Sequence, residues 1–432
     1  MTDRRPGHVL LGINVLVLGY LPAAWQSPLL KKDSFVDPGY WAEIGRTAER
    51  GTLDAIFLAD GPLLTDPAYD ANPVRLEPTV NWGQVAAVTE HVGLVATAST
   101  TFNDPFELAE RLLSWDNLTG GRAAWNLVTT RGAAAARNFG LPDVPLREDR
   151  YERASEFVDV VRALWASAAT GDEVRHHGEF FDVEGRLRVP PSRQGHPVLF
   201  QAGGSPKGRA LAGRVAEGVF AAELTKDQAI EHYRLVKRLA RDNGRSPDEV
   251  KILPGLLLSL GSTEDEARRR SDELHDAGPA SYSLQWLSQA IGYDASKLEL
   301  DEPFPEDVLA APSDPQTFQG SLGFRESIVA QIRRTKPTVR EYLKQTRYTG
   351  SGHAGFVGTP EQLADHIEDW FHSGAIDGFN LQPDVLVDGL PVIADELVPI
   401  LRKRGLYRHE YETDTLRGHL LAGSPTPSPE TL

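Results

Sequence analysis

The sequence predicts one large (β/α)₈ TIM barrel, and three observations support this fold class. Eight short apolar runs, each typical of a buried strand, occur within the 432 residues. Helical patterns separate most of these runs, and this alternation gives parallel strands joined by crossover helices. Eight strands in a chain of this length favour a closed barrel over an open doubly wound sheet. The runs are Val9–Leu18, Ala55–Leu58, Gly93–Thr97, Ala123–Val128, Val198–Gln201, Gly218–Ala221, Ile252–Leu260 and Gly378–Leu381.

The helical segments between the strands carry start signals. Thr225, Thr263 and Thr359 each stand three residues before Gln or Glu, which fits a capping box. Pro360 occupies the first position of the last of these helices, where proline is well tolerated. The predicted helices are Trp41–Arg50, Val80–Glu90, Pro105–Leu118, Arg153–Ala168, Pro206–Gly213, Lys226–Asn243, Glu264–His275 and Glu361–Ser373.

Residues 1–416 are expected to form a single barrel domain. The strand–helix repeat stops between about residues 278 and 358, so this stretch is predicted to be an insertion after the seventh strand. Its place at the catalytic end of a barrel favours a lid or a substrate wall. Residues 417–432 end in a stretch rich in Ser, Pro and Thr, which predicts a flexible tail. The insertion and tail together suggest a homodimer or homotetramer.

The composition excludes several classes of function. The net charge of −16 makes nucleic acid and anionic membranes poor partners, and there are no cysteines for disulfides, thiol catalysis or iron–sulfur ligation. The chain has no apolar stretch of membrane-spanning length and no signal-peptide pattern at its start. A soluble cytoplasmic protein is therefore expected. His176 and His177 precede a Gly and two Phe residues, which favours a hairpin over a metal site.

The most informative stretch runs from Pro197 to Arg209. The strand ends at two glycines, Ser205 stands at the cap position of the next helix, and Pro206 follows it. Glycines let a ligand approach the backbone, and the free N–H groups of a helix start favour an anion. Basic residues in the first turn reverse the usual preference for acids, and a bound phosphate would explain that. An ordinary strand-to-helix turn remains the alternative.

Polar residues also gather at the predicted ends of three other strands. Asp60 follows the second strand, where a barrel places its active site, although a turn or cap aspartate has the same pattern. Thr97 begins a cluster of hydroxyl residues on the third strand, and threonine is common in strands. Asn126 lies in an apolar run and needs a partner, which is either the backbone or a ligand ring. His353 is either an exposed loop histidine or a functional group.

These pieces join longer stretches that resemble the flavin-dependent monooxygenases related to nitrilotriacetate monooxygenase component A and dibenzothiophene sulfone monooxygenase, within the bacterial luciferase-like superfamily. The matching stretches run in order along nearly the whole chain. They are Ala87–Leu94, Thr97–Thr100, Gly120–Thr130, Asn138–Gly140, Arg150–Ala154, His177–Phe181, Gln194–Val198, Gln201–Ser205, Gly358–Pro360, Asp377–Asn380 and Arg404–Tyr407.

The resemblance implies a luciferase-like barrel that binds reduced FMN (FMNH₂) from a separate NAD(P)H:flavin reductase. It implies that O₂ is the co-substrate and that a small organic substrate is oxygenated through a C4a-(hydro)peroxyflavin, the cofactor carrying that chemistry. The residues that it assigns to the cofactor are Asp60 and Thr97 facing the flavin, Asn126 and Thr129 on a flavin-facing strand, and Tyr151, Gly204 and Ser205 at the phosphate.

Two departures from the family pattern stand out. Relatives often carry His where this chain has Arg147, and a guanidinium can still pair with phosphate. The stretch Gly19–Trp25 lacks a histidine that relatives tend to have there, which argues for a changed substrate and leaves His353 as the acid/base candidate. Three alternatives stay open: an F420-dependent oxidoreductase of the same superfamily, a non-redox phosphate-binding barrel enzyme, and a flavin-binding or light-emitting accessory protein.

Overall fold

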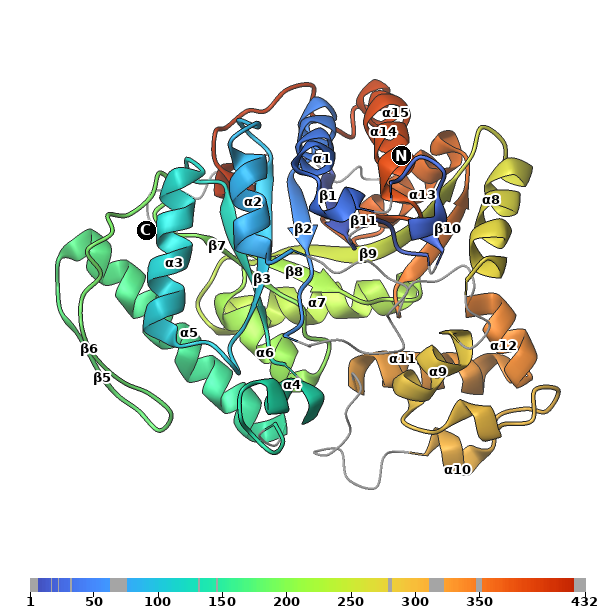
Figure 1. The fold of residues 1–432 in the computed structure, drawn as a ribbon, viewed down its shortest axis with the longest axis horizontal. Coiled ribbons are helices and arrows are strands. Elements are labelled where there is room, and N and C mark those ends of the chain that lie inside the picture. Colours follow the sequence, from blue (N-terminus) through green and yellow to red (C-terminus); the bar gives the residue numbers. More distant parts are fainter. Residues whose placement is uncertain are drawn as a thin grey trace.

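The computed structural model describes residues 7–16, 18–21, 23–31, 33–62, 76–130, 133–144, 147–278, 282–310, 322–346 and 352–422, without the side chains of 133, 147–148, 282–283 and 322–324. Eight parallel strands close into a barrel, which confirms the predicted fold class (Figure 1). In order around the barrel they are β1 (Leu10–Val15), β2 (Ala55–Leu58), β3 (Gly93–Ser99), β4 (Ala123–Val128), β7 (Val198–Gln201), β8 (Gly218–Ala221), β9 (Lys251–Leu260) and β11 (Gly378–Pro383).

The long strand β9 closes the barrel. Its first residues pair with β8, while its middle pairs with β11 on the other side. Beyond the end of β8, the last half of β9 pairs with a ninth strand, β10 (Ala354–Gly358). The sequence prediction missed β10 because it placed these residues at the end of the insertion. They instead extend the sheet, and they follow directly after His353.

Helices surround the barrel, and their starts follow from the sequence. The N-cap threonines predicted at 225, 263 and 359 all accept a hydrogen bond from the backbone N–H three residues on. Of these three, Thr359 alone forms a full reciprocal box, because Gln228 and Glu266 reach back to Leu224 and Ser262 instead. The helices are α1 (Pro38–Arg50), α2 (Pro78–Ala86), α3 (Pro105–Leu118), α4 (Ala133–Asn138), α5 (Arg147–Thr170), α6 (Pro206–Val215), α7 (Lys226–Asp242), α8 (Glu264–Asp276), α13 (Pro360–His372), α14 (Leu386–Val392) and α15 (Val398–Lys403).

The insertion lies between β9 and β11, after the seventh barrel strand, as predicted. It is helical and comprises α9 (Tyr282–Ile291), α10 (Glu306–Leu309), α11 (Leu322–Thr335) and α12 (Val339–Gln345), at the lower right of Figure 1. These helices share a small apolar core of their own, which includes Leu287, Ile328 and Tyr342. Leu224, which follows β8, packs against that core, so the insertion sits at the carboxyl end of the barrel strands.

Aromatic side chains fill the barrel interior. Phe57 on β2 contacts Phe200 on β7 and Phe220 on β8, with ring centroids 6.1 and 5.2 Å apart. Leu416 and Leu420 pack into the same cluster from the amino end of the barrel. They belong to α16 (Leu416–Leu421), which closes the amino end of the barrel. The C-terminal tail predicted to start at Arg417 is corrected here, because residues 417–421 form this packed helix.

The predicted hairpin at His176 and His177 is present as β5 (Val174–His177) and β6 (Asp182–Gly185), which pair antiparallel. It projects beside α5, at the left of Figure 1. His176 Nε2 lies 2.9 Å from Glu156 Oε1 on α5, which ties the hairpin to that helix. Within the described ranges, every helix is too short or too polar to cross a lipid bilayer.

Candidate functional site

Two predicted site residues meet in the interior of the barrel. Thr97 on β3 and Asn126 on β4 are register partners, and both side chains are buried. Asn126 Nδ2 donates to Thr97 Oγ1 across 2.9 Å, and Thr97 Oγ1 donates to the Leu58 carbonyl across 2.8 Å. Asn126 Oδ1 is buried and has no partner among the described residues. A buried carbonyl oxygen without a partner is costly, so this atom points to a ligand.

The predicted phosphate residues meet at the start of α6. Ser205 caps this helix by accepting from Gly208 N across 3.2 Å, and its hydroxyl donates to Tyr151 OH on α5 across 3.1 Å. Ser205 therefore uses its hydroxyl within the protein, while the hydrogen of Tyr151 OH has no acceptor among the described residues. The first turn of α6 carries no acidic residue. Gly204 lies half-buried just before the cap, where its backbone is accessible.

The basic residues of α6 have different environments. Lys207 Nζ lies 3.2 Å from Glu152 Oε1 at the surface, so part of the charge inferred from sequence is already neutralised. Arg209 Nε is buried and has no hydrogen-bond partner in the described part of the chain. Within the described ranges, the first two turns of α6 therefore contain a guanidinium N–H without a partner and no acidic side chain. This arrangement favours a bound anion.

His353 is buried, which overturns the interpretation of an exposed loop histidine. Its ring stacks on Phe220 with centroids 5.0 Å apart, at the carboxyl end of β8. Burial lowers the pKa of His353 to about 4, although a hydrogen bond to the Ala221 backbone opposes that shift. The imidazole is therefore neutral at pH 7. A neutral ring can accept a proton but has none to spare as an acid.

The remaining predicted residues lie at the same end of the barrel. Asp60 follows β2 and Thr129 follows β4, and both are half-buried. Arg147 is the first residue of α5, one turn before Tyr151, but its side chain lies outside the described residues.

Sequence reasoning missed three buried amides. Asn14 on β1 and Asn380 and Gln382 on β11 are at most 4% exposed. Like Asn126, each is an amide within an apolar strand, so the argument applied to Asn126 would have found them. Together with Thr97 and Asn126, they make the carboxyl half of the barrel interior polar.

These features fit a cofactor with a phosphate at one end and a polar flat ring at the other. The start of α6 supplies hydroxyl and backbone donors for the phosphate. Inside the barrel, Asn126 Oδ1 is an acceptor with no partner among the described residues. FMN has both chemical features. The residues present therefore fit the group that the sequence resemblance implies.

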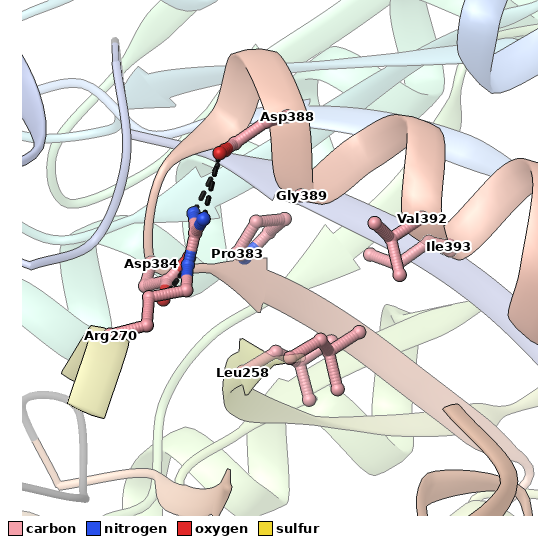
Figure 2. Close-up of a pocket in the computed structure, with 9 residues that line it drawn as sticks. Leu258, Arg270, Pro383, Asp384, Asp388, Gly389, Val392 and Ile393 are labelled. Atoms are coloured by element: carbon pink, nitrogen blue, oxygen red, sulfur yellow. Dashed lines mark hydrogen bonds and ion pairs between the residues drawn. The ribbon is translucent and has the colours of Figure 1, made fainter. Parts of the chain in front are cut away.

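One cavity of about 70 Å³ lies elsewhere, outside the barrel wall (Figure 2). It is lined by Leu258 and Pro383 from neighbouring strands and by Val392 and Ile393 near the end of α14. Arg270 bridges Asp384 and Asp388 at its rim through four hydrogen bonds of 2.7–2.9 Å. The cavity is smaller than ordinary small-molecule sites, which exceed roughly 300 Å³, and its charges are mutually satisfied. We interpret it as a packing defect.

Comparisons with known proteins identify the family of this chain. Residues 20–378 match the family described as luciferase-like monooxygenase. The chain is 38% identical to N-acetyl-S-(2-succino)cysteine monooxygenase of Bacillus subtilis (strain 168), over 97% of each chain. It is also 38% identical to nitrilotriacetate monooxygenase component A of Aminobacter aminovorans, over 96% of each. The solved structure of EDTA monooxygenase from Chelativorans sp. BNC1 superimposes with a TM-score of 0.77 at 31% identity, covering 96% of this chain and 98% of that one.

These relatives are named monooxygenases and match over nearly their whole length. They support the main prediction from sequence and not the F420-dependent or non-redox alternatives. The fold, the polar barrel interior and the family match lead to one conclusion: the chain is a monooxygenase of the luciferase-like monooxygenase family.

Proposed function

We propose that this monooxygenase binds FMNH₂ delivered by a separate NAD(P)H:flavin reductase and uses O₂ to oxygenate a small organic substrate. One relative is named as component A, which supports a system of more than one protein. The observation that carries the cofactor assignment is the contact between Ser205 and Tyr151 at the start of α6, where the first turn holds no acid.

The phosphate end of the cofactor is held by hydrogen-bond donors. Tyr151 OH and the backbone at Gly204 bind phosphate oxygens, and Arg147 adds charge in place of the family's histidine. Ser205 acts mainly by fixing Tyr151 and the helix start, because its hydroxyl is already engaged. Charge-assisted bonds of this kind are strong and directional.

The ring end is oriented inside the barrel. Thr97 fixes the Asn126 amide so that Oδ1 accepts from the ring, and Asp60 and Thr129 border the ring at the strand ends. The aromatic cluster in the barrel interior and the helical insertion at the carboxyl end of the barrel exclude bulk water from the ring. Exclusion of water matters because reduced flavin, when bound, activates O₂ for transfer of one oxygen atom, and stray protons divert that reaction to peroxide.

His353 serves as the proton acceptor on the substrate side. Its imidazole is neutral at pH 7 because burial depresses its pKa. Stacking on Phe220 holds the ring in place. In this neutral form the ring can accept a hydrogen bond or a transient proton from the substrate side.

Oxygen uptake tests this proposal. Purified protein, an FMN reductase and NADH are mixed with a panel of candidate substrates, and both O₂ consumption and oxygenated product are measured. We expect product only when reduced FMN is supplied. Equal turnover with NADH and no flavin, or turnover with reduced F420 instead of FMNH₂, would contradict it.

The proposal extends to a homodimer or homotetramer located in the cytoplasm. Val80 on α2 and Phe106 and Leu118 on α3 are 73%, 47% and 86% exposed, and a second copy of the chain packed on these helices would cover them. Light scattering on the purified protein measures the assembly, and a monomer at micromolar concentration would argue against it.

A further inference from the structure

Three buried amides, which we call the amide wall, line one side of the barrel interior in its carboxyl half. They are Asn14 on β1 and Asn380 and Gln382 on β11, and their exposed fractions are 1%, 4% and 0%. The side-chain atoms Asn14 Nδ2 and Oδ1, Asn380 Oδ1 and Gln382 Nε2 and Oε1 are buried and have no hydrogen-bond partner within the described ranges. Five such atoms on two adjacent strands are far more than packing alone explains.

The amide wall faces the barrel interior. Phe379 and Leu381 belong to the core outside the barrel, and Phe379 lies 5.4 Å from Trp370 on α13, so their neighbours in sequence point inward. On β1, Leu10 belongs to the interior cluster, and Asn14 lies four residues further along the same face.

Two glycines make room for these amides. A Cβ atom at Gly12 would lie 3.0 Å from Asn380 Oδ1. A Cβ atom at Gly255 would lie 2.6 Å from Gln382 Nε2 and 2.6 Å from His353 Nδ1. Gln382 and His353 therefore converge on one point of the interior, and the amide wall is next to the proposed proton acceptor.

The unpartnered atoms define the ligand chemistry. Both amide ends of Asn14 and of Gln382 have no partner among the described residues. The wall therefore offers hydrogen-bond donors and acceptors whichever way the amides are turned. An anion needs donors alone, a metal cation needs oxygen ligands with negative charge, and an apolar substrate uses neither. A flat edge with alternating C=O, N–H and C=O groups uses both.

We propose that the amide wall binds the pyrimidinedione edge of the flavin ring. This inference rests on the proposed function, since FMN carries that edge in both its oxidised and reduced forms. It assigns three residues to ring recognition, separate from the phosphate contacts at α6 and from Thr97 and Asn126. It also places the recognised edge on the side of the barrel that holds His353.

The test uses the whole wild-type protein and two modified ligands. Dissociation constants are measured by flavin fluorescence for FMN, for 3-methyl-FMN, which lacks the N3–H donor, and for 8-chloro-FMN, which is changed at the opposite edge. We expect 3-methyl-FMN to bind at least about tenfold more weakly than FMN, equivalent to about 1.4 kcal/mol. We expect 8-chloro-FMN to bind within about threefold of FMN.

Two variants locate the effect. Asn14→Leu and Gln382→Leu should each bind FMN about tenfold more weakly and should largely lose discrimination against 3-methyl-FMN. The matched control is Asn81→Leu, because Asn81 is 1% exposed and its Nδ2 has no partner in the described part of the chain, but it lies on α2 outside the barrel. This control should retain the wild-type ratio. Infrared spectra of bound FMN provide a second readout, since the C2=O and C4=O stretches should shift on binding and shift less in Gln382→Leu.

The outcomes separate the two proposals. If wild-type protein binds no FMN, the proposed function and this inference both fail. If it binds FMN and 3-methyl-FMN equally well, only the inference is overturned. If a variant does not fold, the comparison of ligands on the wild-type protein still decides.

Discussion

Asn126 and Thr97 form a hydrogen-bonded pair inside the barrel, with Asn126 Nδ2 2.9 Å from Thr97 Oγ1. Thr97 in turn donates to the Leu58 carbonyl on the next strand, so its hydroxyl cannot rotate freely. The chain of two bonds fixes which end of the Asn126 amide faces the protein and leaves Oδ1 for a ligand. A threonine on one strand therefore sets the hydrogen-bonding character of its neighbour.

Thr97→Val tests that relationship, because it removes both bonds while keeping the side-chain shape. Asn126 can then rotate, and we expect about fivefold weaker FMN binding, equivalent to about 1 kcal/mol for a lost hydrogen bond. We also expect a larger share of O₂ to appear as peroxide, measured per NADH consumed with the reductase present. Thr47→Val, at a buried threonine on α1, is the matched control and should change neither quantity.

Tyr151→Phe removes the one hydroxyl hydrogen that the Ser205 pair leaves free. We expect about tenfold weaker binding of FMN and no change for riboflavin, which has no phosphate. Tyr411→Phe is the control, because its hydroxyl donates to the Leu53 carbonyl far from α6. An equal loss for riboflavin and FMN would show that Tyr151 does not act on the phosphate.

Leu416→Ala and Leu420→Ala test the helix that closes the amino end of the barrel. Both side chains are at most 3% exposed, so each substitution should lower the free energy of unfolding by about 2–5 kcal/mol. Leu421→Ala, at a position 39% exposed in the same helix, should change it by less than about 0.5 kcal/mol. Urea unfolding measures all three. Similar small effects would mean that α16 does not stabilise the barrel.

The buried ion pair of Asp54 and Arg408 fastens the C-terminal segment to the barrel. Arg408 Nη1 lies 3.0 Å from Asp54 Oδ1, and Asp54 Oδ2 accepts from Leu11 N across 2.6 Å. Asp54→Asn leaves a buried guanidinium without its counter-charge, so we expect a loss of about 3–5 kcal/mol.

The exposed pair of Arg193 and Asp414 is the matched comparison for that substitution. Asp414→Asn should cost less than about 1 kcal/mol, because water screens the pair. Thermal unfolding of both variants distinguishes the two cases, and equal shifts in melting temperature would contradict the assigned roles.

Stability should depend on pH through His353. Burial lowers its pKa to about 4 from the ordinary 6.5, so the unfolded chain binds a proton between pH 6.5 and 4 that the folded chain does not. Stability is therefore fully present above pH 6.5 and falls as the pH drops through that window. At pH 5 this one group accounts for a loss of about 2 kcal/mol relative to pH 7.

His353→Gln should reduce that pH-dependent loss by a similar amount, measured by urea unfolding at pH 7 and pH 5. His409→Gln, at an exposed histidine, is the control for removing an imidazole. An unchanged difference between the two pH values in His353→Gln would show that the ring is not held neutral by burial.

Much of the fold can be predicted from the sequence, because the patterns that indicate its strands and helix starts are local. All eight barrel strands are short apolar runs, and the threonine caps and Pro360 mark helix starts. The ninth strand, β10, is different: Ala354–Gly358 is short and is interrupted by two glycines, and its strand conformation depends on pairing with β9. The packing of α16 is equally non-local, because Leu416 meets Phe57 and Phe200 only after the barrel has closed.

The candidate site also has parts that are local in sequence and parts that depend on the folded structure. The helix start at Ser205 could be predicted because its glycines, cap and proline are adjacent in sequence. Arg209 and Lys207 look alike there, yet only the structure shows that Glu152 neutralises one of them. The amide wall could be suspected from polar residues in apolar strands. Its convergence with His353 could not, since it depends on Gly255 of a third strand.

The most direct test of the central claim is an anaerobic titration of the protein with FMNH₂, followed by calorimetry. We expect one FMNH₂ to bind per chain, and we expect reduced riboflavin to bind more weakly because it lacks the phosphate. Absence of binding heat with FMNH₂, or equal affinity for the two reduced flavins, would contradict it.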